Sequence, residues 1–210
     1  MAEIDLARLL AHELEPSLIS IQLRLRSLAE AGACRAEAES CLAEVEAIRA
    51  LLRDFLLLGG RELDNRSFSL PPLFETLARR FEPLAAARGI TLEADGDPTE
   101  VAGDPVATER ILSNLIDNAV KFSPEGSRIA VVAREHAGKV TVRIADQGSG
   151  IPRLERERVF EPFVRLDPER PGAGLGLSIA RELAEAQGGE VLLTGEPDEG
   201  SIFILTLRKA

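Results

Sequence analysis

The 210-residue chain contains 25 Lys and Arg against 35 Asp and Glu, which gives a formal net charge of −10, and 45% of its residues are hydrophobic. This length and apolar content suffice for one large domain or two small ones. The negative charge argues against a nucleic acid or an anionic membrane as the partner, because phosphate surfaces attract basic proteins. The sequence has no tryptophan or tyrosine, so the aromatic platforms of single-strand nucleic-acid binders are also missing.

No apolar run approaches the roughly 20 residues that a membrane-spanning helix needs. The N-terminal sequence MAEIDLARLL lacks the basic region and apolar stretch of a signal peptide. We therefore expect a cytoplasmic protein. Cys34 and Cys41 are too few for a disulfide framework or a metal cage, and we expect both to be reduced.

Two amphipathic helices are predicted in the first 60 residues, over about 4–28 and 37–58. Each has apolar residues at the three- and four-residue spacing of a heptad seam. The seams comprise Leu14, Leu18, Ile21, Leu25 and Leu28 in the first helix, and Leu42, Val45, Ile48, Leu52 and Phe55 in the second. Because a two-helix hairpin cannot bury both seams by itself, we expect a homodimer that forms a four-helix bundle.

His12 lies about 160° around the first helix from Leu14, so its imidazole is expected to face away from the seam. A lone histidine on a helix is ordinarily a solvated surface residue. Here Glu13 follows it, and Pro16 has no N–H to bond the carbonyl oxygen of His12. The helix is therefore expected to loosen or bend at this turn, which makes a merely solvated role less favourable without excluding it.

Beyond the hairpin, the glycine-led and polar stretch GGRELDNR at 59–66 predicts a linker, which we place at 61–66 between domains at 1–60 and 67–210. The second domain mixes helices with largely antiparallel strands, which predicts an α+β layer fold. The expected elements are an extended piece at 67–70, helices at 72–88, 109–124 and 175–187, and strands at 90–95, 128–134, 139–145, 190–194 and 201–207. His136 is expected to be a solvated residue of the turn EHAG.

The helix over 109–124 combines packing with binding groups. At 100° per residue, a polar stripe of Asn114, Asn118 and Lys121 runs beside an apolar stripe of Ile111, Leu115, Ala119 and Phe122. An amide oxygen can bind a hard metal ion, and a lysine can bind phosphate. A half-buried helix with solvated asparagines would show the same pattern, so this stretch alone leaves both interpretations open.

The strand over 139–145 runs directly into DQGSGIP, which places Asp146 at the end of a sheet strand. Its carboxylate could accept a hydrogen bond from an exocyclic amine such as that of adenine. Gly148 and Gly150 would let a ring approach the backbone. An ordinary turn with Asp and Gly is the alternative interpretation.

Further on, GAGLGLSIA places Gly172, Gly174 and Gly176 just before a helix, where unpaired N–H groups and the helix dipole favour phosphate. A glycine run of this kind is a weak signal alone. Between the two glycine motifs, VFEPFVR contains Phe160 and Phe163, which we expect to form a hydrophobic latch, and Arg165, a candidate phosphate contact.

These four elements, in this order, closely resemble the N, G1, F and G2 boxes of the GHKL (Bergerat-fold) ATPases, and more narrowly those of sensor histidine kinases. The resemblance covers the chain from about Phe68 to the C-terminus. The first helix is similar to the dimerisation and phosphoacceptor domain of that family, whose H-box begins with His-Glu.

The resemblance implies an ATP-dependent protein-histidine kinase of a two-component system, which uses ATP and Mg²⁺. Asn118 would coordinate Mg²⁺ with support from Asn114, Lys121 would reach the phosphates, and Asp146 would recognise adenine. The remaining nucleotide contacts that it implies are Gly148, Gly150, Phe160, Arg165, Gly172, Gly174, Leu175 and Gly176, beneath a lid at about 161–173. His12 would be the nucleophile and Glu13 its base or hydrogen-bond acceptor. The phosphoryl group would then pass to an aspartate of a response regulator.

The chain departs from the family pattern after the His-Glu pair. Glu15 replaces a basic residue, and Pro16 comes one position early, so the polar residue that orients a dephosphorylating water in the family is missing. We therefore expect weak or absent phosphatase activity toward the regulator, although Ser17 could partly substitute. Only 11 residues precede His12, so the input is expected to arrive through a separate sensor protein or a missing sensor region.

Two other functions remain open at this stage. The chain could be a phosphotransfer adaptor, in which His12 only relays phosphoryl groups and the ATP domain is a remnant. It could also be a GHKL protein-serine kinase or ATPase without phosphohistidine. The intact Asn118, Asp146 and glycine positions argue against the remnant, and the outward His-Glu pair argues against the serine kinase.

Overall fold

The structure is a computed structural model of the chain, and it describes residues 18–28, 38, 41–42, 45, 48, 63–97, 99–167, 174–196 and 199–210. The chain divides into two compact units, one within the first 62 residues and one from Leu63 onward. In the first unit, residues 18–28 are helical, as are positions 38, 41, 42, 45 and 48. Each of these positions falls inside a predicted helix. The dimeric bundle, His12 and Glu13 lie outside what the structure describes.

The described residues of the second unit form a seven-stranded sheet of order β1-β3-β7-β5-β4-β2, in which β6 also pairs with β7. The strands are β1 Arg66–Ser69, β2 Thr91–Gly96, β3 Glu100–Gly103, β4 Arg128–His136, β5 Lys139–Ala145, β6 Glu190–Glu196 and β7 Gly200–Lys209. The β2–β4 pair is parallel, and the other described pairs are antiparallel. The prediction of largely antiparallel strands is therefore confirmed.

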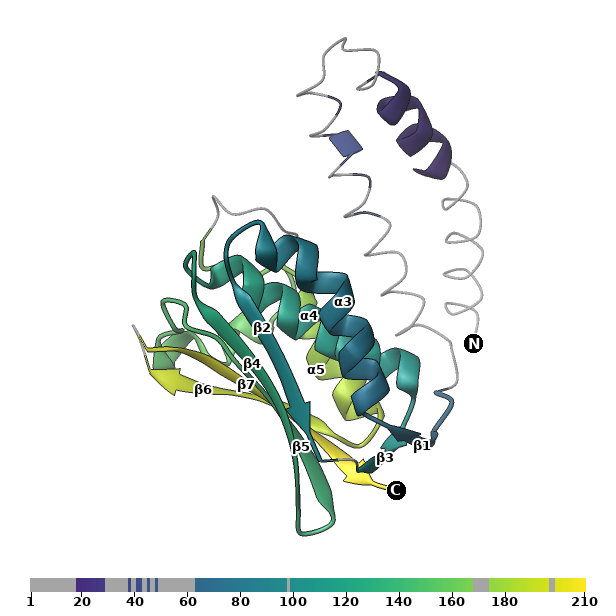
Figure 1. Cartoon of the computed structure of the whole chain (residues 1–210), viewed down its shortest axis with the longest axis vertical. Coiled ribbons are helices and arrows are strands. Elements are labelled where there is room, and N and C mark those ends of the chain that lie inside the picture. Colours follow the sequence, from purple (N-terminus) through teal and green to yellow (C-terminus); the bar gives the residue numbers. More distant parts are fainter. Residues whose placement is uncertain are drawn as a thin grey trace. The chain divides into compact units, whose positions relative to one another are not determined.

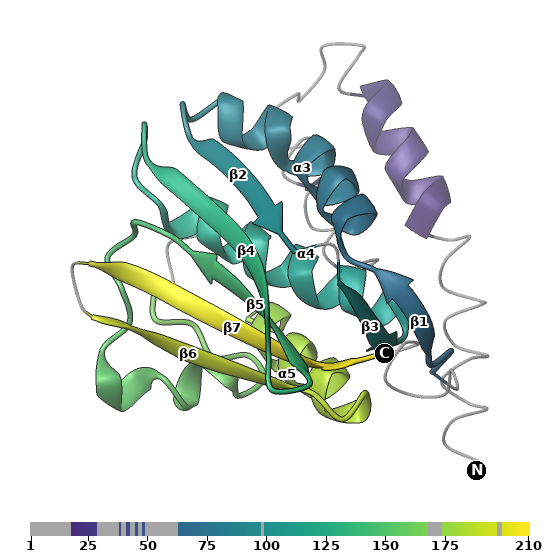
Figure 2. The same cartoon turned by 60° about the horizontal axis from the view of Figure 1, so that its bottom comes forward.

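Three helices cover one face of this sheet, as Figures 1 and 2 show: α3 Pro71–Ala86, α4 Pro105–Phe122 and α5 Gly176–Ala186. The core lies between the helices and the sheet. Val140, Val142 and Ile144 of β5 are fully buried there, as their alternation along the strand predicts. The chain between β5 and α5 contains two short 3₁₀ helices, η1 Arg153–Glu155 and η2 Arg158–Phe160.

Several boundaries differ from the prediction. Strand β3 was not predicted, because four residues ending in glycine show too little alternation to be recognised. The turn between β4 and β5 consists of Ala137 and Gly138 alone, both with positive φ (51° and 74°). His136 is therefore the last residue of β4 and not a turn residue. Helix α4 begins at Pro105, four residues before the predicted stretch, because Asp104 caps it.

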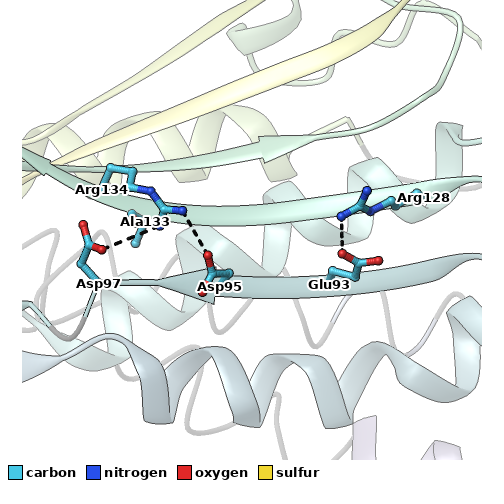
Figure 3. A network of polar contacts seen from close by, with 6 residues as sticks. All are labelled: Glu93, Asp95, Asp97, Arg128, Ala133 and Arg134. Atoms are coloured by element: carbon cyan, nitrogen blue, oxygen red, sulfur yellow. Dashed lines mark hydrogen bonds and ion pairs between the residues drawn. The ribbon is translucent and has the colours of Figure 1, made fainter.

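Ion pairs join the edge strand β2 to β4 (Figure 3). Glu93 pairs with Arg128, and the guanidinium of Arg134 lies 3.1 Å from Asp95 and 4.0 Å from Asp97. These side chains are about half to three-quarters exposed, so each pair contributes about 0–1 kcal/mol to stability. Their charges also disfavour edge-to-edge pairing with another sheet.

Candidate functional site

Helix α4 is held at both of its ends by polar groups. At the start, Oδ1 of Asp104 accepts hydrogen bonds from the backbone N–H groups of Val106 (2.8 Å) and Ala107 (3.1 Å), as expected of an N-cap residue. At the other end, the guanidinium of Arg88 donates to the carbonyl oxygens of Val120, Lys121 (3.3 Å) and Ser123 (2.8 Å). A cation here satisfies orphan carbonyls and favours the negative end of the helix dipole.

Of the predicted apolar stripe of α4, Ile111, Leu115 and Ala119 are fully buried in the core, whereas Phe122 is half-buried. On the polar stripe, Asn114, Asn118 and Lys121 are half-buried. The Asn114 side-chain nitrogen Nδ2 is buried and has no hydrogen-bond partner within the described residues. Because a buried donor without a partner is unfavourable, this amide suits an anionic ligand.

Lys121 forms an ion pair that the sequence analysis did not predict. Its Nζ lies 2.6 Å from Oδ2 of Asp117, one helical turn earlier, and both side chains are 38% exposed. At this exposure the pair contributes little to stability. The ion pair with Asp117 by itself therefore holds the ammonium only weakly.

The start of α5 packs against the middle of α4. A Cβ atom added to Gly176, the first residue of α5, would lie 3.8 Å from Cβ and Cγ of Asn114. The unpaired N–H groups of the first turn of α5 therefore lie beside the Asn114 amide. Both features favour a negatively charged group.

Asp146 follows β5 and is 6% exposed. Its Oδ1 accepts hydrogen bonds from the backbone N–H groups of Gly148 (2.8 Å) and Ser201 (3.0 Å). Burial raises the pKa of the Asp146 carboxyl, and these two hydrogen bonds oppose the rise. Within the described residues Oδ2 makes no hydrogen bond and is not sealed from solvent. One carboxylate oxygen thus serves the fold, and the other is available to a ligand.

Gly148 brings the Asp146 loop against the C-terminal end of α4. A Cβ atom on Gly148 would lie 2.8 Å from the carbonyl oxygen of Phe122 and 2.9 Å from Oδ1 of Asp146, so only glycine fits. Gly150 has a positive φ of 68°. Asp146 therefore lies near the end of α4, and Gly176 lies near its middle, about 12 Å earlier along the axis.

The segment that contains the two phenylalanines is arranged differently from the prediction. Phe160, in η2, is 5% exposed, and the guanidinium carbon of Arg181 lies 3.8 Å from its ring centroid. Phe163 is 72% exposed, so the expectation that both rings form a hydrophobic latch is wrong for Phe163. Its backbone φ of 66° turns the chain here, and its N–H donates to the carbonyl oxygen of Gly174 (2.9 Å).

Gly174 lies where these two segments meet. It has a φ of 71°, and an added Cβ atom would lie 2.8 Å from the carbonyl carbon of Phe163 and 3.1 Å from Cγ of Arg165. The Arg165 side chain is exposed, and Leu175 is half-buried. Gly172 and part of the expected lid lie outside the described residues.

Among the described residues, no group of three or more His, Cys, Asp or Glu side chains could hold a metal ion. Mg²⁺ is commonly bound by only one or two protein ligands together with substrate phosphates. A single amide oxygen from the polar stripe of α4, together with phosphates of a bound ligand, fits that mode of binding.

Sequence reasoning missed several residues that shape this site. Ser201 completes the hydrogen bonding of Asp146, and a Cβ atom on Gly200 would lie 2.0 Å from the Asp146 carbonyl oxygen. Arg88 caps α4, and Gln187 joins α5 to the start of α4. Gly200 was the one signal in the sequence for these contacts, but Asp146, which it lies against, is far away in the chain.

The region over residues 103–210 matches the family described as histidine kinase-, DNA gyrase B-, and HSP90-like ATPase. The chain belongs to this family. The resemblance inferred from the four motifs is therefore confirmed, and the second unit has the two-layer α/β sandwich of GHKL ATPases.

Curated relatives extend the similarity over most of the chain. It is 30% identical to the alginate biosynthesis sensor protein KinB of Pseudomonas aeruginosa, over 94% of this chain and 35% of KinB. It is also 30% identical to the adaptive-response sensory kinase SasA of Prochlorococcus marinus, over 96% of this chain and 56% of SasA. The chain thus spans only about a third to a half of these relatives.

Solved structures agree with the family assignment. Full-length ShkA, crystallised in complex with AMPPNP, is similar with a TM-score of 0.81 and 29% identity, over 98% of this chain and 46% of ShkA. The mycobacterial sensor histidine kinase MprB is similar with a TM-score of 0.62 and 30% identity, over 69% of this chain and 97% of that structure. Within the described residues, no helix is long and apolar enough to cross a membrane.

Proposed function

We propose that this chain is an ATP-dependent protein-histidine kinase, which autophosphorylates His12 and passes the phosphoryl group to an aspartate of a response regulator. The observation that carries the proposal is that two groups suited to a nucleotide lie along one helix, α4. Near the end of α4, Asp146 has a carboxylate oxygen available to a ligand. At the middle of α4, Asn114 lies beside the first residue of α5, and its buried Nδ2 has no hydrogen-bond partner within the described residues. A purine fits beside the end of α4, and a phosphate chain fits beside its middle.

The nucleotide contacts follow from this arrangement. Oδ2 of Asp146 accepts the adenine amine, while Gly148 and Gly150 shape the purine pocket. The Lys121 ammonium leaves Asp117 for a phosphate. The triphosphate is framed by Gly172, Gly174, Leu175 and Gly176 together with Phe160 and Arg165. The ShkA complex with AMPPNP supports a nucleotide site in this fold.

Asn118 would hold Mg²⁺ through its amide oxygen, with Asn114 in support. When bound, the ion supplies positive charge that neutralises the phosphate oxygens. Most of the catalysis is then positioning and charge neutralisation, because phosphoryl transfer requires little acid–base chemistry from the protein.

In the transfer step, a ring nitrogen of His12 attacks the γ-phosphorus in line. The bond between that phosphorus and the bridging oxygen breaks, and ADP leaves with its electron pair. Glu13 accepts a hydrogen bond from the other ring N–H and so holds the attacking tautomer. The linker predicted at 61–66, whose last residue Arg66 is the first residue of β1 in the structure, would let the ATP-binding domain, 67–210, approach and leave the phosphoacceptor domain, 1–60.

The same proposal includes a cytoplasmic homodimer formed by the N-terminal helices. Of the described seam positions, Ile21 is 46%, Leu28 is 51% and Ile48 is 48% exposed in a single chain, whereas Leu18, Leu25 and Leu42 are half-buried and Val45 is buried. Large apolar side chains at seam spacing with this exposure support pairing with a second copy. Dimerisation is measured by sedimentation of the full chain, and a monomer at micromolar concentration would contradict it.

Incorporation of label from γ-labelled ATP and Mg²⁺ tests the kinase directly, with the full chain compared with His12→Gln. We expect acid-labile label in the parent and none in the variant. Acid-stable label would instead support the serine kinase. Nucleotide binding without any label would support the ATPase or the adaptor.

The unusual sequence after His12 gives a second test. Because Pro16 cannot orient a water molecule, we propose that the kinase has weak or absent phosphatase activity toward its regulator. Purified phospho-regulator should lose label equally slowly with and without this protein. Rapid loss of label from the phospho-regulator on adding the protein would contradict this prediction.

A further inference from the structure

Gln187, at the C-terminal end of α5, joins this helix to the start of α4. Its Oε1 accepts hydrogen bonds from the backbone N–H of Asp104 (2.7 Å) and from the hydroxyl of Thr108 (3.2 Å). Its Nε2 donates to the carbonyl oxygen of Leu183 within α5 (3.1 Å). Gln187 is 7% exposed and Thr108 is fully buried, so water does not compete for these bonds.

The side-chain amide of Gln187 lies close to the backbone of Gly103. A Cβ atom added to Gly103 would lie 2.6 Å from Oε1 of Gln187, which is closer than real contacts allow. The glycine at this position therefore lets the amide reach the backbone N–H of Asp104. The same Asp104 caps α4 through its side chain. The hydrogen bonds of Gln187 thus act on the residue that defines where α4 begins.

The two contacts between α4 and α5 lie at opposite ends of the interface. On α5, Gly176 and Gln187 are 11 residues apart, or about 16.5 Å along the axis. On α4, their neighbours Asn114 and Asp104 are 10 residues apart, or about 15 Å. These two distances along the helix axes differ by about 1.5 Å, which is the rise of one helical residue. A shift of α5 at the Gln187 end therefore moves Gly176 by the same amount along Asn114.

Most of the buried side chains on these two helices are apolar, and several are small. They include Ile111, Leu112 and Leu115 on α4, and Ile179, Ala180, Leu183 and Ala184 on α5, besides the polar Thr108, Ser113 and Ser178. Burial of apolar surface is not directional, whereas a hydrogen bond weakens steeply when its distance or angle departs from the optimum. The Gln187 hydrogen bonds therefore specify the axial position of α5 more sharply than these apolar contacts do.

We propose that Gln187 is a positioning residue, which sets the axial register of α5 against α4 and so places the phosphate-binding start of α5 beside Asn114. The inference rests on the proposed nucleotide site. Gln187 lies at the far end of α5 from Gly176, so it acts through the helix. Asp146, which recognises the purine, is held by Gly148 and Ser201 and not by α5. Loss of the Gln187 hydrogen bonds is thus expected to affect phosphate binding and to leave adenine binding unchanged.

The test compares AMP with AMPPNP, each titrated with Mg²⁺ into the full chain and into Gln187→Met, which keeps the length of the side chain but removes its hydrogen bonds. We expect the Kd for AMPPNP to rise about tenfold, because small misplacements of binding groups are costly, and the Kd for AMP to stay within about twofold. If Gln187 had only a structural role, the Kd values for AMPPNP and AMP would rise together or both stay unchanged. Either result would overturn the inference.

Leu92→Ala is the matched control, because Leu92 lies on the edge strand β2, away from α5. It should lower the melting temperature without changing the ratio of the two constants. If Gln187→Met does not fold, Thr108→Val removes one of the same hydrogen bonds, and Thr108→Ser should restore the parent ratio. A parent chain that binds neither nucleotide would refute the proposed function itself, whereas a parent that binds both, with an unchanged ratio in the variants, would refute only the role of Gln187.

Discussion

Asp146→Asn separates the two roles that the structure gives this carboxylate. Oδ1 accepts from the N–H groups of Gly148 at 2.8 Å and Ser201 at 3.0 Å, and an asparagine carbonyl can accept the same bonds. The amide nitrogen then occupies the place of Oδ2. A donor there faces the adenine amine, which is also a donor. The variant is therefore expected to keep its fold and to lose adenine recognition.

The expected size of the loss follows from the charge on the acceptor. A hydrogen bond to a charged group contributes about 1.5–3 kcal/mol. Because each 1.4 kcal/mol is a factor of ten in affinity, the Kd for AMPPNP should rise about 10- to 150-fold. Inosine triphosphate carries a carbonyl in place of the amine, so the Asp146→Asn variant should lose most of its preference for ATP over this nucleotide.

Calorimetric titration with each nucleotide measures the change, and thermal unfolding checks the fold. Asp146→Ala is the control, because it leaves two buried N–H groups unpaired, each at a cost of about 1–3 kcal/mol, and should melt well below the parent. Unchanged AMPPNP affinity in Asp146→Asn would refute adenine recognition by this residue. An asparagine variant that melts as low as the alanine variant would refute the separation of roles between the two oxygens.

Three further predictions concern the same site. Burial raises the pKa of Asp146 in the folded state, so between its ordinary and raised values the folded protein binds more protons than the unfolded one. As the pH rises through that window, the contribution of Asp146 to the free energy of unfolding should fall while nucleotide affinity increases. Chemical denaturation and titrations at several pH values should show that Asp146→Asn lacks this contribution to both slopes. Gly148→Ala should destabilise the domain and abolish nucleotide binding, because its Cβ would lie 2.8 Å from a backbone oxygen, whereas Gly176→Ala, with its nearest contact at 3.8 Å, should melt at or above the parent temperature. Arg88→Met should lower the melting temperature by roughly 4–10 °C, from about 2 kcal/mol of lost hydrogen bonding at the end of α4, and Arg88→Lys should recover part of it; an unchanged melting temperature would show that the cap is dispensable.

Periodicity predicted the elements that bury one side along a regular repeat. The alternation of Val140, Val142 and Ile144 located β5, and the stripe of Ile111, Leu115 and Ala119 located α4. Strand β3 was not predicted, because its pairing with β1 and β7 depends on residues far away in the chain. Where burial depends on distant partners, the local pattern carries too little information.

The residues of the candidate site also divide into those that a local pattern predicts and those that depend on distant partners. Asp146 and Gly148 could be recognised because they are adjacent in the sequence, and their short spacing carries the motif. Ser201, which binds the same carboxylate, lies 55 residues later and meets it only through the register of β5 with β7. Gln187 and Asp104 are separated by 83 residues. Sequence reasoning located the groups that could touch a ligand and missed the groups that hold them.

These holding groups explain how an 18-residue helix can present polar side chains that make few bonds of their own. Helix α4 is fixed at its start by Asp104 and Gln187 and at its end by Arg88, while the amide nitrogen of Asn114 in its middle is buried and has no partner in the part of the chain that the structure describes. The desolvation of that amide has already occurred in the folded chain, so it adds no cost when a phosphate binds. Affinity for the phosphates then depends on how accurately the fold places the amide, and substitutions at Gln187 or Arg88, which lie at opposite ends of α4, should weaken binding independently.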